Sequence, residues 1–165
     1  MTPLLDEIEA AIPGLRAYAR ALLRDREAAD DLVQDTLEAA VARAGQWRGE
    51  GSLRGWLCRI LLNRFRDGYR RRAAAPVLAL VAEPSAPPQA EARLALAEVH
   101  AAMGRLPDDQ RAALLLVALQ GLSLAEAAAA LGVAEGTLAS RLARARAALR
   151  QMTGREDPTR PRKGH

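Results

Sequence analysis

The chain has 165 residues, of which half are hydrophobic and only 3% are aromatic, and its formal net charge is +4. This length allows one or two small domains and leaves no room for a large enzyme cavity. A single cysteine, Cys58, excludes an internal disulfide, and together with His100 and His165 it gives no metal-binding spacing. We therefore expect no metal and no other cofactor.

The composition also argues against a membrane protein and against an enzyme. No apolar stretch is long enough to cross a bilayer, and the first ten residues carry acids where a signal peptide would be basic. No spacing of histidine, cysteine, serine or carboxylate residues is typical of catalysis. We expect a cytoplasmic, helical protein with no catalytic residues and no membrane insertion.

Charge is unevenly distributed along the chain. Residues 1–40 contain nine acids and four bases, whereas residues 41–72 contain nine bases and two acids. Residues 73–110 are again acidic, and residues 111–150 are again basic, with five bases and two acids. Two basic blocks separated by an acidic one indicate two contacts with nucleic acid and a further surface with a different task.

The N-terminal part of the sequence predicts three helices. A short helix begins at Pro3, a second begins at Pro13, and a third, capped by Asp25, runs to about Arg43. The outer side of the third helix is acidic and carries Asp30, Asp31, Asp35 and Glu38, with Gln34 among them. Acids on a helix surface are most often simply solvated, so this face has no assigned function from its pattern alone.

A basic helix follows a glycine-rich loop. Residues 44–51 hold three glycines around Trp47, which predicts a loop with an aromatic anchor, and Ser52 then caps a fourth helix. The polar side of that helix carries Arg54, Arg59, Arg64, Arg66 and the run Arg70 to Arg72, with Asn63 among them. So many like charges repel one another unless an anion relieves them, which favours nucleic acid over a merely solvated helix.

The middle of the chain predicts a linker. From Ala73 to about Ala90 there are prolines at positions 76, 84, 87 and 88, and this density prevents a continuous helix. A second helical domain is expected to start near Glu91. Within it, Leu106-Pro107-Asp108 predicts a turn and a helix cap, and residues 113–119 predict a strongly apolar helix.

Residues 123–150 predict a helical hairpin. Ser123 and Glu126 form a capping box, Gly132 ends the first helix, and a second helix begins near Glu135. One face of the second helix carries Thr137, Ser140, Arg141 and Arg144. A basic, hydroxyl-bearing face suits a recognition helix in the major groove of DNA, although an ordinary hairpin with a solvated arginine face gives the same pattern.

These elements predict an all-α protein with two small helical domains joined by a proline-rich linker. The expected boundaries are residues 1–72 for the first domain, 73–90 for the linker and 91–151 for the second domain. Residues 152–165 form a basic tail for which we expect no ordered structure.

Five motifs carry a family resemblance. They are ADDLVQD from Ala29, LRGWLCRI from Leu53 with Asn63 after it, LPDDQR from Leu106, GLSLAEAAAALGV from Gly121 and EGTLASRLARAR from Glu135. In this order and spacing the chain resembles the extracytoplasmic-function (ECF) group of bacterial sigma factors, of the sigma-70 superfamily. The resemblance implies a sigma region 2 helical bundle at residues 1–72 and a sigma region 4 helix-turn-helix at residues 91–151. ADDLVQD and LPDDQR are also similar to the general-stress-response branch found in alphaproteobacteria.

The resemblance implies a task for each surface. The acidic helix would dock on the clamp helices of the RNA polymerase β′ subunit through Asp31, Gln34 and Asp35, and region 4 would meet the β flap. The glycine loop and the fourth helix would recognise and open the minus-ten promoter element and flip a base into a pocket. The residues implied there are Trp47, Arg48, Gly49, Glu50, Arg59, Asn63, Arg66 and Arg70. The hairpin would read the minus-thirty-five element through Thr137, Ser140, Arg141 and Arg144, and the linker would thread the polymerase channels.

An anti-sigma factor is a further partner that the resemblance implies.

The sequence departs from the family pattern at two positions. Ala134 stands where serine or proline is usual, and Ala139 stands where many relatives have lysine or arginine. Weaker or differently specific binding of the minus-thirty-five element is therefore expected.

Two other functions fit parts of the sequence. A stand-alone helix-turn-helix regulator would explain the hairpin but would leave the acidic helix and the linker without a task. A sigma-like mimic that sequesters an anti-sigma factor would explain the helices, but such relatives usually lack a basic recognition face.

Overall fold

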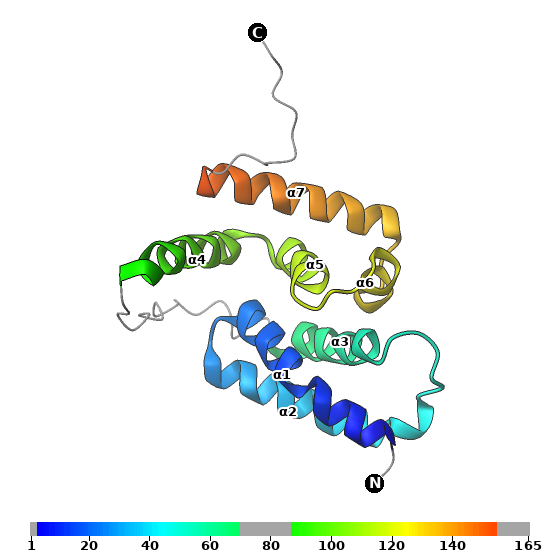
Figure 1. Cartoon of the computed structure of the whole chain (residues 1–165). Coiled ribbons are helices and arrows are strands. Elements are labelled where there is room, and N and C mark those ends of the chain that lie inside the picture. Colours follow the sequence, from blue (N-terminus) through cyan, green and yellow to red (C-terminus); the bar gives the residue numbers. More distant parts are fainter. Residues whose placement is uncertain (1–2, 70–86, 155–165) are drawn as a thin grey trace.

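The computed structural model describes residues 3–69 and 87–154, and within these residues the chain is helical with no β-strand (Figure 1). The helices are α1 (Pro3–Leu23), α2 (Arg26–Ala42), α3 (Leu53–Arg64), α4 (Pro87–Arg105), α5 (Asp108–Ala118), α6 (Leu124–Leu131) and α7 (Glu135–Thr153). A 3-10 turn (Ala44–Gln46) follows α2, and a π-helical turn (Phe65–Tyr69) follows α3. The all-α prediction is confirmed.

The N-terminus forms one helix where the sequence predicted two. Pro13 lies inside α1 instead of starting a new helix, and its side chain is exposed. Proline removes one backbone hydrogen bond, but Ile8 and Leu15 on either side of it are both buried in the same core. Their burial holds the two segments in one helical register, so packing overrides the local signal.

The start of α2 follows the sequence closely. Arg24 ends α1 in the left-handed conformation with φ 61°, and Asp25 then caps α2 by accepting a hydrogen bond from the Ala28 amide at 3.1 Å. The predicted inner stripe of α2 packs toward α1 and α3, with Ala29 and Leu32 fully buried. The cap thus fixes where the acidic helix begins, and the stripe fixes which of its faces points outward.

The linker boundary differs from the prediction. The helix α4 begins at Pro87, before the expected start at Glu91. A proline in the first turn of a helix lacks an amide that would have no intrahelical partner anyway, so prolines 87 and 88 are compatible with a helix start. Residues 70–86, which include Arg70, and residues 155–165 of the predicted tail lie outside the described residues.

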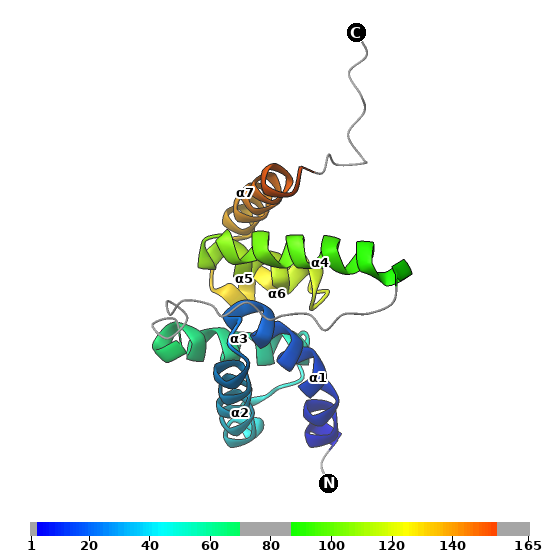
Figure 2. The same cartoon turned by 90° about the vertical axis from the view of Figure 1, so that its left-hand side faces the viewer.

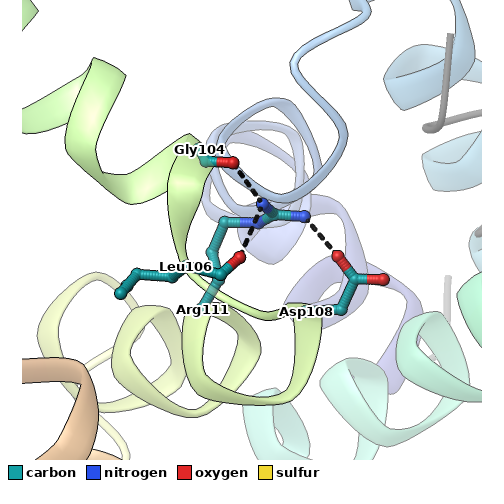
Figure 3. Close-up of polar contacts among 4 residues, drawn as sticks. All are labelled: Gly104, Leu106, Asp108 and Arg111. Atoms are coloured by element: carbon teal, nitrogen blue, oxygen red, sulfur yellow. Dashed lines mark hydrogen bonds and ion pairs between the residues drawn. The ribbon is translucent and has the colours of Figure 1, made fainter. Parts of the chain in front are cut away.

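Arg111 organises the turn between α4 and α5 (Figure 3). Its Nη2 donates to the Asp108 carboxylate at 2.8 Å, and its Nη1 lies 3.5 Å from the carbonyls of Gly104 and Leu106. The predicted turn is present, and the cap position of α5 falls within it. Pro107 occupies the cap position without a side-chain bond, and Asp108 is held by Arg111 instead.

The N-terminal half (α1–α3) and the C-terminal half (α4–α7) pack directly against each other. Their buried apolar side chains form a continuous cluster that extends from Ile8 in α1 to Ala145 in α7. Figures 1 and 2 show α3 lying beside α6, at the junction of the halves. The buried Tyr18 hydroxyl donates to the Ala112 carbonyl of α5 at 3.2 Å, and burial raises the pKa of Tyr18 well above its ordinary value.

Candidate nucleic-acid and polymerase interfaces

The acidic face of α2 is open to solvent at two of its three predicted contact residues. Asp31 and Gln34 are exposed, whereas Asp35 is half-buried. The Gln34 amide donates to the Glu38 carboxylate at 3.2 Å, one helical turn further on. Asp30, the remaining acid of the motif, accepts a hydrogen bond from Arg20 of α1 at 3.2 Å. Asp30 therefore links two helices, and Asp31 and Gln34 form the outward surface.

Two tryptophan rings in contact anchor the loop between α2 and α3. The Trp47 ring lies 5.3 Å from the Trp56 ring between centroids, with the planes inclined by 40°. Gly49 and Gly51 have φ values of 72° and 79°, a conformation that side chains with a Cβ rarely adopt. The two flanking residues predicted to meet DNA, Arg48 and Glu50, are exposed. The two tryptophan rings thus lie at the base of an open, polar loop.

The position of α3 is fixed by its cap and by its buried side. Ser52 accepts a hydrogen bond from the Gly55 amide at 3.2 Å, as the sequence predicted. Leu57 and Leu61 are fully buried, and Cys58 beside them is buried too. Burial raises the pKa of the Cys58 thiol to about 12, which marks it as a core residue.

The outer side of α3 and the following turn enclose a hollow of about 330 Å³. It is lined by Arg43, Ile60, Asn63, Arg64, Arg66 and Asp67. Asn63 and Arg66, both predicted contacts, come together here, whereas Arg59 is exposed elsewhere on the helix. Arg43 and Arg64 are not among the residues predicted for this site. The basic run pointed to Arg64, but Arg43 arrives from the end of α2, which a linear pattern does not reveal.

Two arginines of this basic segment bind the C-terminal half of the molecule. Arg66 Nη2 donates to the Leu131 carbonyl at the end of α6, at 3.0 Å. Arg54 Nη1 donates to the Gln120 carbonyl, also at 3.0 Å. Part of the positive charge that the sequence assigned to nucleic acid therefore also neutralises and holds backbone dipoles inside the molecule.

The helix-turn-helix begins with the predicted capping box. The Ser123 amide donates to the Glu126 carboxylate at 2.8 Å, and the Glu126 amide donates to the Ser123 hydroxyl at 3.1 Å. The bond from the Ser123 amide, followed by one from the Ser123 side chain, lowers the pKa of Glu126. Gly132 closes α6 with φ 68°, and Ala134 starts α7 without a side-chain cap, as expected for alanine at that position.

The exposed face of α7 holds most of its predicted DNA contacts. Thr137, Ser140 and Arg144 are exposed, with Leu138 buried on the opposite side. Arg141 differs because it is half-buried and lies 3.9 Å from Asp109 of α5. The structure thus brings three of the four residues to one open surface and ties the fourth to the helix behind it.

No metal or membrane site is found in the parts of the chain that the structure describes. Within residues 3–69 and 87–154, His, Cys, Asp and Glu side chains form no group of three or more that could hold a metal ion. The helices of the same residues include none that is long and apolar enough to span a bilayer.

Two family models match the two halves of the chain. Residues 8–62 match the Sigma2 domain of PhyR, and residues 96–149 match sigma-70 region 4. Their order agrees with the fold, in which a helical bundle with an acidic α2 and a basic α3 precedes a helix-turn-helix. The two matched regions are thus a sigma region 2 domain followed by sigma-70 region 4.

Full-length relatives narrow the family. The chain is 42% identical to the ECF RNA polymerase sigma factor EcfG of Rhodopseudomonas palustris over 160 residues, covering 93% of this chain and 88% of the relative. It is 43% identical to the ECF sigma factor SigM of Mycobacterium tuberculosis, covering 85% of this chain and 71% of the relative. The chain belongs to the ECF RNA polymerase sigma factors.

Solved structures of related sigma factors share the fold. The sigma factor RpoE of Bartonella quintana, in complex with the anti-sigma factor NepR, matches with a TM-score of 0.76 and 31% identity, covering 92% of this chain and 97% of that one. CnrH in complex with the cytosolic domain of CnrY matches with a TM-score of 0.69 and 30% identity, covering 93% and 89% of the two chains.

Proposed function

We propose that this chain directs promoter-specific initiation of transcription as a dissociable subunit of RNA polymerase, with no catalytic chemistry of its own. The observation that carries the proposal is one chain holding an exposed acidic face on α2, a basic loop and helix at α3, and a basic recognition face on α7. Three surfaces of these kinds match three tasks, namely polymerase docking and contact with two promoter elements. As a polymerase subunit the chain would act in the cytoplasm.

The docking surface is the outer face of α2. Asp31, Gln34 and Asp35 would contact the clamp helices of the β′ subunit, while the C-terminal half would meet the β flap. Support comes from the exposure of Asp31 and Gln34 and from the anchoring of the helix by its cap and by Asp30. Electrostatic complementarity at such a surface speeds association and sets orientation.

The minus-ten element would be opened by the loop and by the hollow beside α3. Flipping a base out of the duplex costs a few kcal/mol of lost stacking, so the protein must offer a preformed site. The hollow lined by Asn63 and Arg66 has the polar edges and the positive charge that such a site requires. Trp47, in the loop before α3, provides an aromatic surface. Arg48, Gly49, Glu50, Arg59 and Arg70 complete the proposed contact set.

The minus-thirty-five element would be read by α7. Exposed Arg144 is suited to a bidentate contact with guanine, and Thr137 and Ser140 are suited to phosphates or base edges at the first turns. Arg141 reaches the same groove only if it leaves Asp109. This difference makes Arg144 the principal proposed base contact.

An anti-sigma factor is the proposed regulator. The related structures include sigma factors bound to NepR or to CnrY, and a complex of the PhyR sigma-like domain with NepR from Sphingomonas sp. Fr1 that matches with a TM-score of 0.67 and 26% identity. Together with ADDLVQD and LPDDQR, these relatives support membership of the general-stress-response branch, with a NepR-like partner.

A second candidate function is mimicry. The N-terminal half matches the Sigma2 domain of PhyR, and a solved complex of PhyR with NepR resembles the chain, which favours a protein that captures an anti-sigma factor. The exposed basic face of α7 favours the sigma factor instead. Transcription is the discriminating measurement, because a mimic gives none.

The test is specific initiation in vitro. The purified chain and bacterial core polymerase are incubated with a library of genomic fragments, and the 5′ ends of the transcripts are mapped. Transcripts that start at shared sites and need the chain would support the proposal. Absence of any transcript that depends on the chain, with the core enzyme active on another sigma factor, would reject it.

A docking variant tests the α2 assignment. The double variant Asp31→Ala, Gln34→Ala is expected to weaken core polymerase binding roughly tenfold, because it removes two polar side chains from the exposed face of α2. The control is Asp6→Ala with Gln151→Ala, which removes the same chemical groups from exposed positions of α1 and α7. Equal affinities for the two double variants, with unchanged circular dichroism, would refute the clamp assignment.

A further inference from the structure

Arg141 stands at the edge of the recognition face of α7. It follows Thr137 by four residues, so at about 100° per residue its Cα lies only about 40° around the helix from Thr137. About 40° further around by the same count, Ala145 is fully buried. An arginine at such an edge can direct its guanidinium outward into a groove of DNA or back toward the protein.

In the structure this guanidinium is turned back toward α5. Nη2 of Arg141 lies 3.9 Å from the Asp109 carboxylate, and the Arg141 side chain is 23% exposed against 56% for Asp109. Helix α5 packs against α7, and Asp109 belongs to the first turn of α5. The ion pair therefore joins the recognition helix to the helix behind it and separates Arg141 from the exposed side chain of Arg144.

The bonding of Arg141 in this position is incomplete. A separation of 3.9 Å makes an ion pair but not a hydrogen bond, and Nη1 of Arg141 is buried with no hydrogen-bond partner among the described residues. A buried donor without a partner is unfavourable. Arg144, three residues further along the helix, adds repulsion between like charges. Asp109 therefore holds Arg141, but holds it weakly.

Guanine offers this guanidinium a more complete set of partners. In the major groove its O6 and N7 atoms accept two hydrogen bonds from one arginine, which would satisfy the donor that is buried without a partner in the structure. Bases that lack this pair of acceptors give no such gain. At those bases the ion pair with Asp109 is the better arrangement for Arg141.

We propose that Asp109 is a positioning residue of the recognition helix, whose carboxylate competes with guanine for Arg141 and so relaxes base selection at one position of the bound DNA. This rests on the proposed reading of DNA by α7. Arg144 is exposed and free to contact its base at every site, whereas Arg141 leaves Asp109 only where guanine lies within its reach. Because the ion pair must break first, that guanine adds less affinity, and the protein tolerates other bases there.

The test removes the carboxylate and keeps its shape. Asp109→Asn is compared with the wild type, with Arg141→Ala and with the variant that carries both substitutions. Each purified full-length chain selects from a pool of DNA duplexes that are randomised over about one helical turn, at one fixed salt concentration. Sequencing of the bound duplexes identifies the base pair whose preference is lost in Arg141→Ala.

At that base pair the preference for guanine is expected to rise roughly threefold in Asp109→Asn, which is the size of a partly exposed ion pair. Anisotropy titrations with duplexes that differ only at this base pair measure the change. When Arg141→Ala is also present, Asp109→Asn is expected to have no effect on the preference, because the competing guanidinium is absent. Asp109→Ala should reproduce the result of Asp109→Asn, since both lack the charge.

Loss of an acid also raises the affinity of a protein for any DNA, so the control removes the same charge elsewhere. Glu135→Gln does this at an exposed position in the first turn of α7. It is expected to strengthen binding to all duplexes alike, without changing the preference at any base pair. An equal gain on all duplexes in Asp109→Asn, or a gain in preference that persists with Arg141→Ala, would overturn the proposal. So would a selection in which no base preference depends on Arg141.

The outcomes separate this proposal from the sigma function itself. If Asp109→Asn sharpens the preference through Arg141 but no promoter-dependent transcript is obtained, the ion pair acts as proposed and the polymerase function is wrong. If transcripts are obtained and the base preference is the same in the wild type and in Asp109→Asn, the sigma function stands and the competition is rejected.

Discussion

The helices α3 and α7 carry the same kind of basic surface, but the fold treats them differently. Both are predicted to contact DNA, and each begins at a defined cap residue, Ser52 for α3 and Ala134 for α7. The α3 segment lies at the junction of the halves, where Arg54 and Arg66 donate to carbonyls of the other half. On α7 the residues Thr137, Ser140 and Arg144 face solvent.

This difference shows that charge pattern alone does not determine whether a basic surface is available. An arginine has five donors and can satisfy a backbone carbonyl as well as a phosphate. In the α3 segment Arg54 and Arg66 donate to carbonyls of the other half, whereas on α7 Arg141 pairs with Asp109 and Arg144 is exposed.

The largest expected effects come from deleting core side chains in the two helices. Leu57→Ala in α3 and Leu138→Ala in α7 each remove a fully buried side chain and should each destabilise the protein by about 2–5 kcal/mol. Urea unfolding is followed by tryptophan fluorescence, which reports on Trp47 and Trp56, and by circular dichroism, which reports on all helices. For Leu57→Ala the two probes should shift together, because α3 packs on both halves.

For Leu138→Ala the circular dichroism change should precede the fluorescence change. Helix α7 packs on α4, α5 and α6, so its loss weakens the C-terminal half first. Coincident transitions in this variant would show that α7 is as strongly coupled to the N-terminal half as α3, which removes the contrast between the helices.

The next largest effect is expected at the turn between α4 and α5, the helices on which α7 packs. Asp108→Ala leaves the buried guanidinium of Arg111 without its carboxylate and should destabilise the protein by about 2–3 kcal/mol. Burial already lowers the pKa of Arg111, and the Asp108 carboxylate opposes that shift. The matched control is the neighbouring Asp109→Ala, an exposed position where the expected loss is under about 0.5 kcal/mol. Equal midpoints of thermal unfolding would contradict the structural assignment of LPDDQR.

The helices α3 and α7 are also expected to differ in DNA binding. Arg144→Ala should weaken binding of a minus-thirty-five duplex by about 1–3 kcal/mol, both in the free chain and on polymerase, because its side chain is already exposed. Arg66→Ala should weaken binding of the minus-ten strand by less, because its guanidinium also bonds to the Leu131 carbonyl. Anisotropy titrations at one fixed salt concentration measure both. A loss for Arg66→Ala as large as that for Arg144→Ala would mean that the internal bond of Arg66 does not compete with DNA.

The smallest expected effect is a pH dependence at the junction. Partial removal from water, and then the Arg24 guanidinium, hold the pKa of His100 below its ordinary value of 6.5. The folded protein therefore favours the neutral ring, so this stabilisation is complete above pH 6.5 and is lost as pH falls through the lowered folded value. Wild-type stability should fall slightly more than that of His100→Gln between pH 7.5 and pH 5.5. Parallel losses in urea midpoint would exclude a contribution from His100.

Local signals were the reliable part of the sequence argument. Asp25, Ser52 and Ser123 each cap the helix that the pattern assigned to them, and Gly132 closes α6 in the left-handed conformation. These features depend on bonds between residues three or four apart, so a linear sequence contains all their partners. The acidic face of α2 and the recognition face of α7 follow from the same short periodicity.

The failures share one physical cause, which is a distant partner that outweighs the local preference. Pro13 does not divide α1, because residues on both sides of it are buried in one core. Arg43 lines the hollow beside α3 although it belongs to the end of α2.

The sequence by itself determined that the protein is all-helical, where most helices begin and end, and which family it resembles, since short-range caps, periodicity and motif order carry that information. Tertiary structure alone decided which basic residues are available. The pairing of α3 with α6, the burial of Gln120 and the approach of Arg24 over Gly104 join residues that are far apart in the chain. Such contacts depend on how two amphipathic halves pack, and no local pattern encodes that packing.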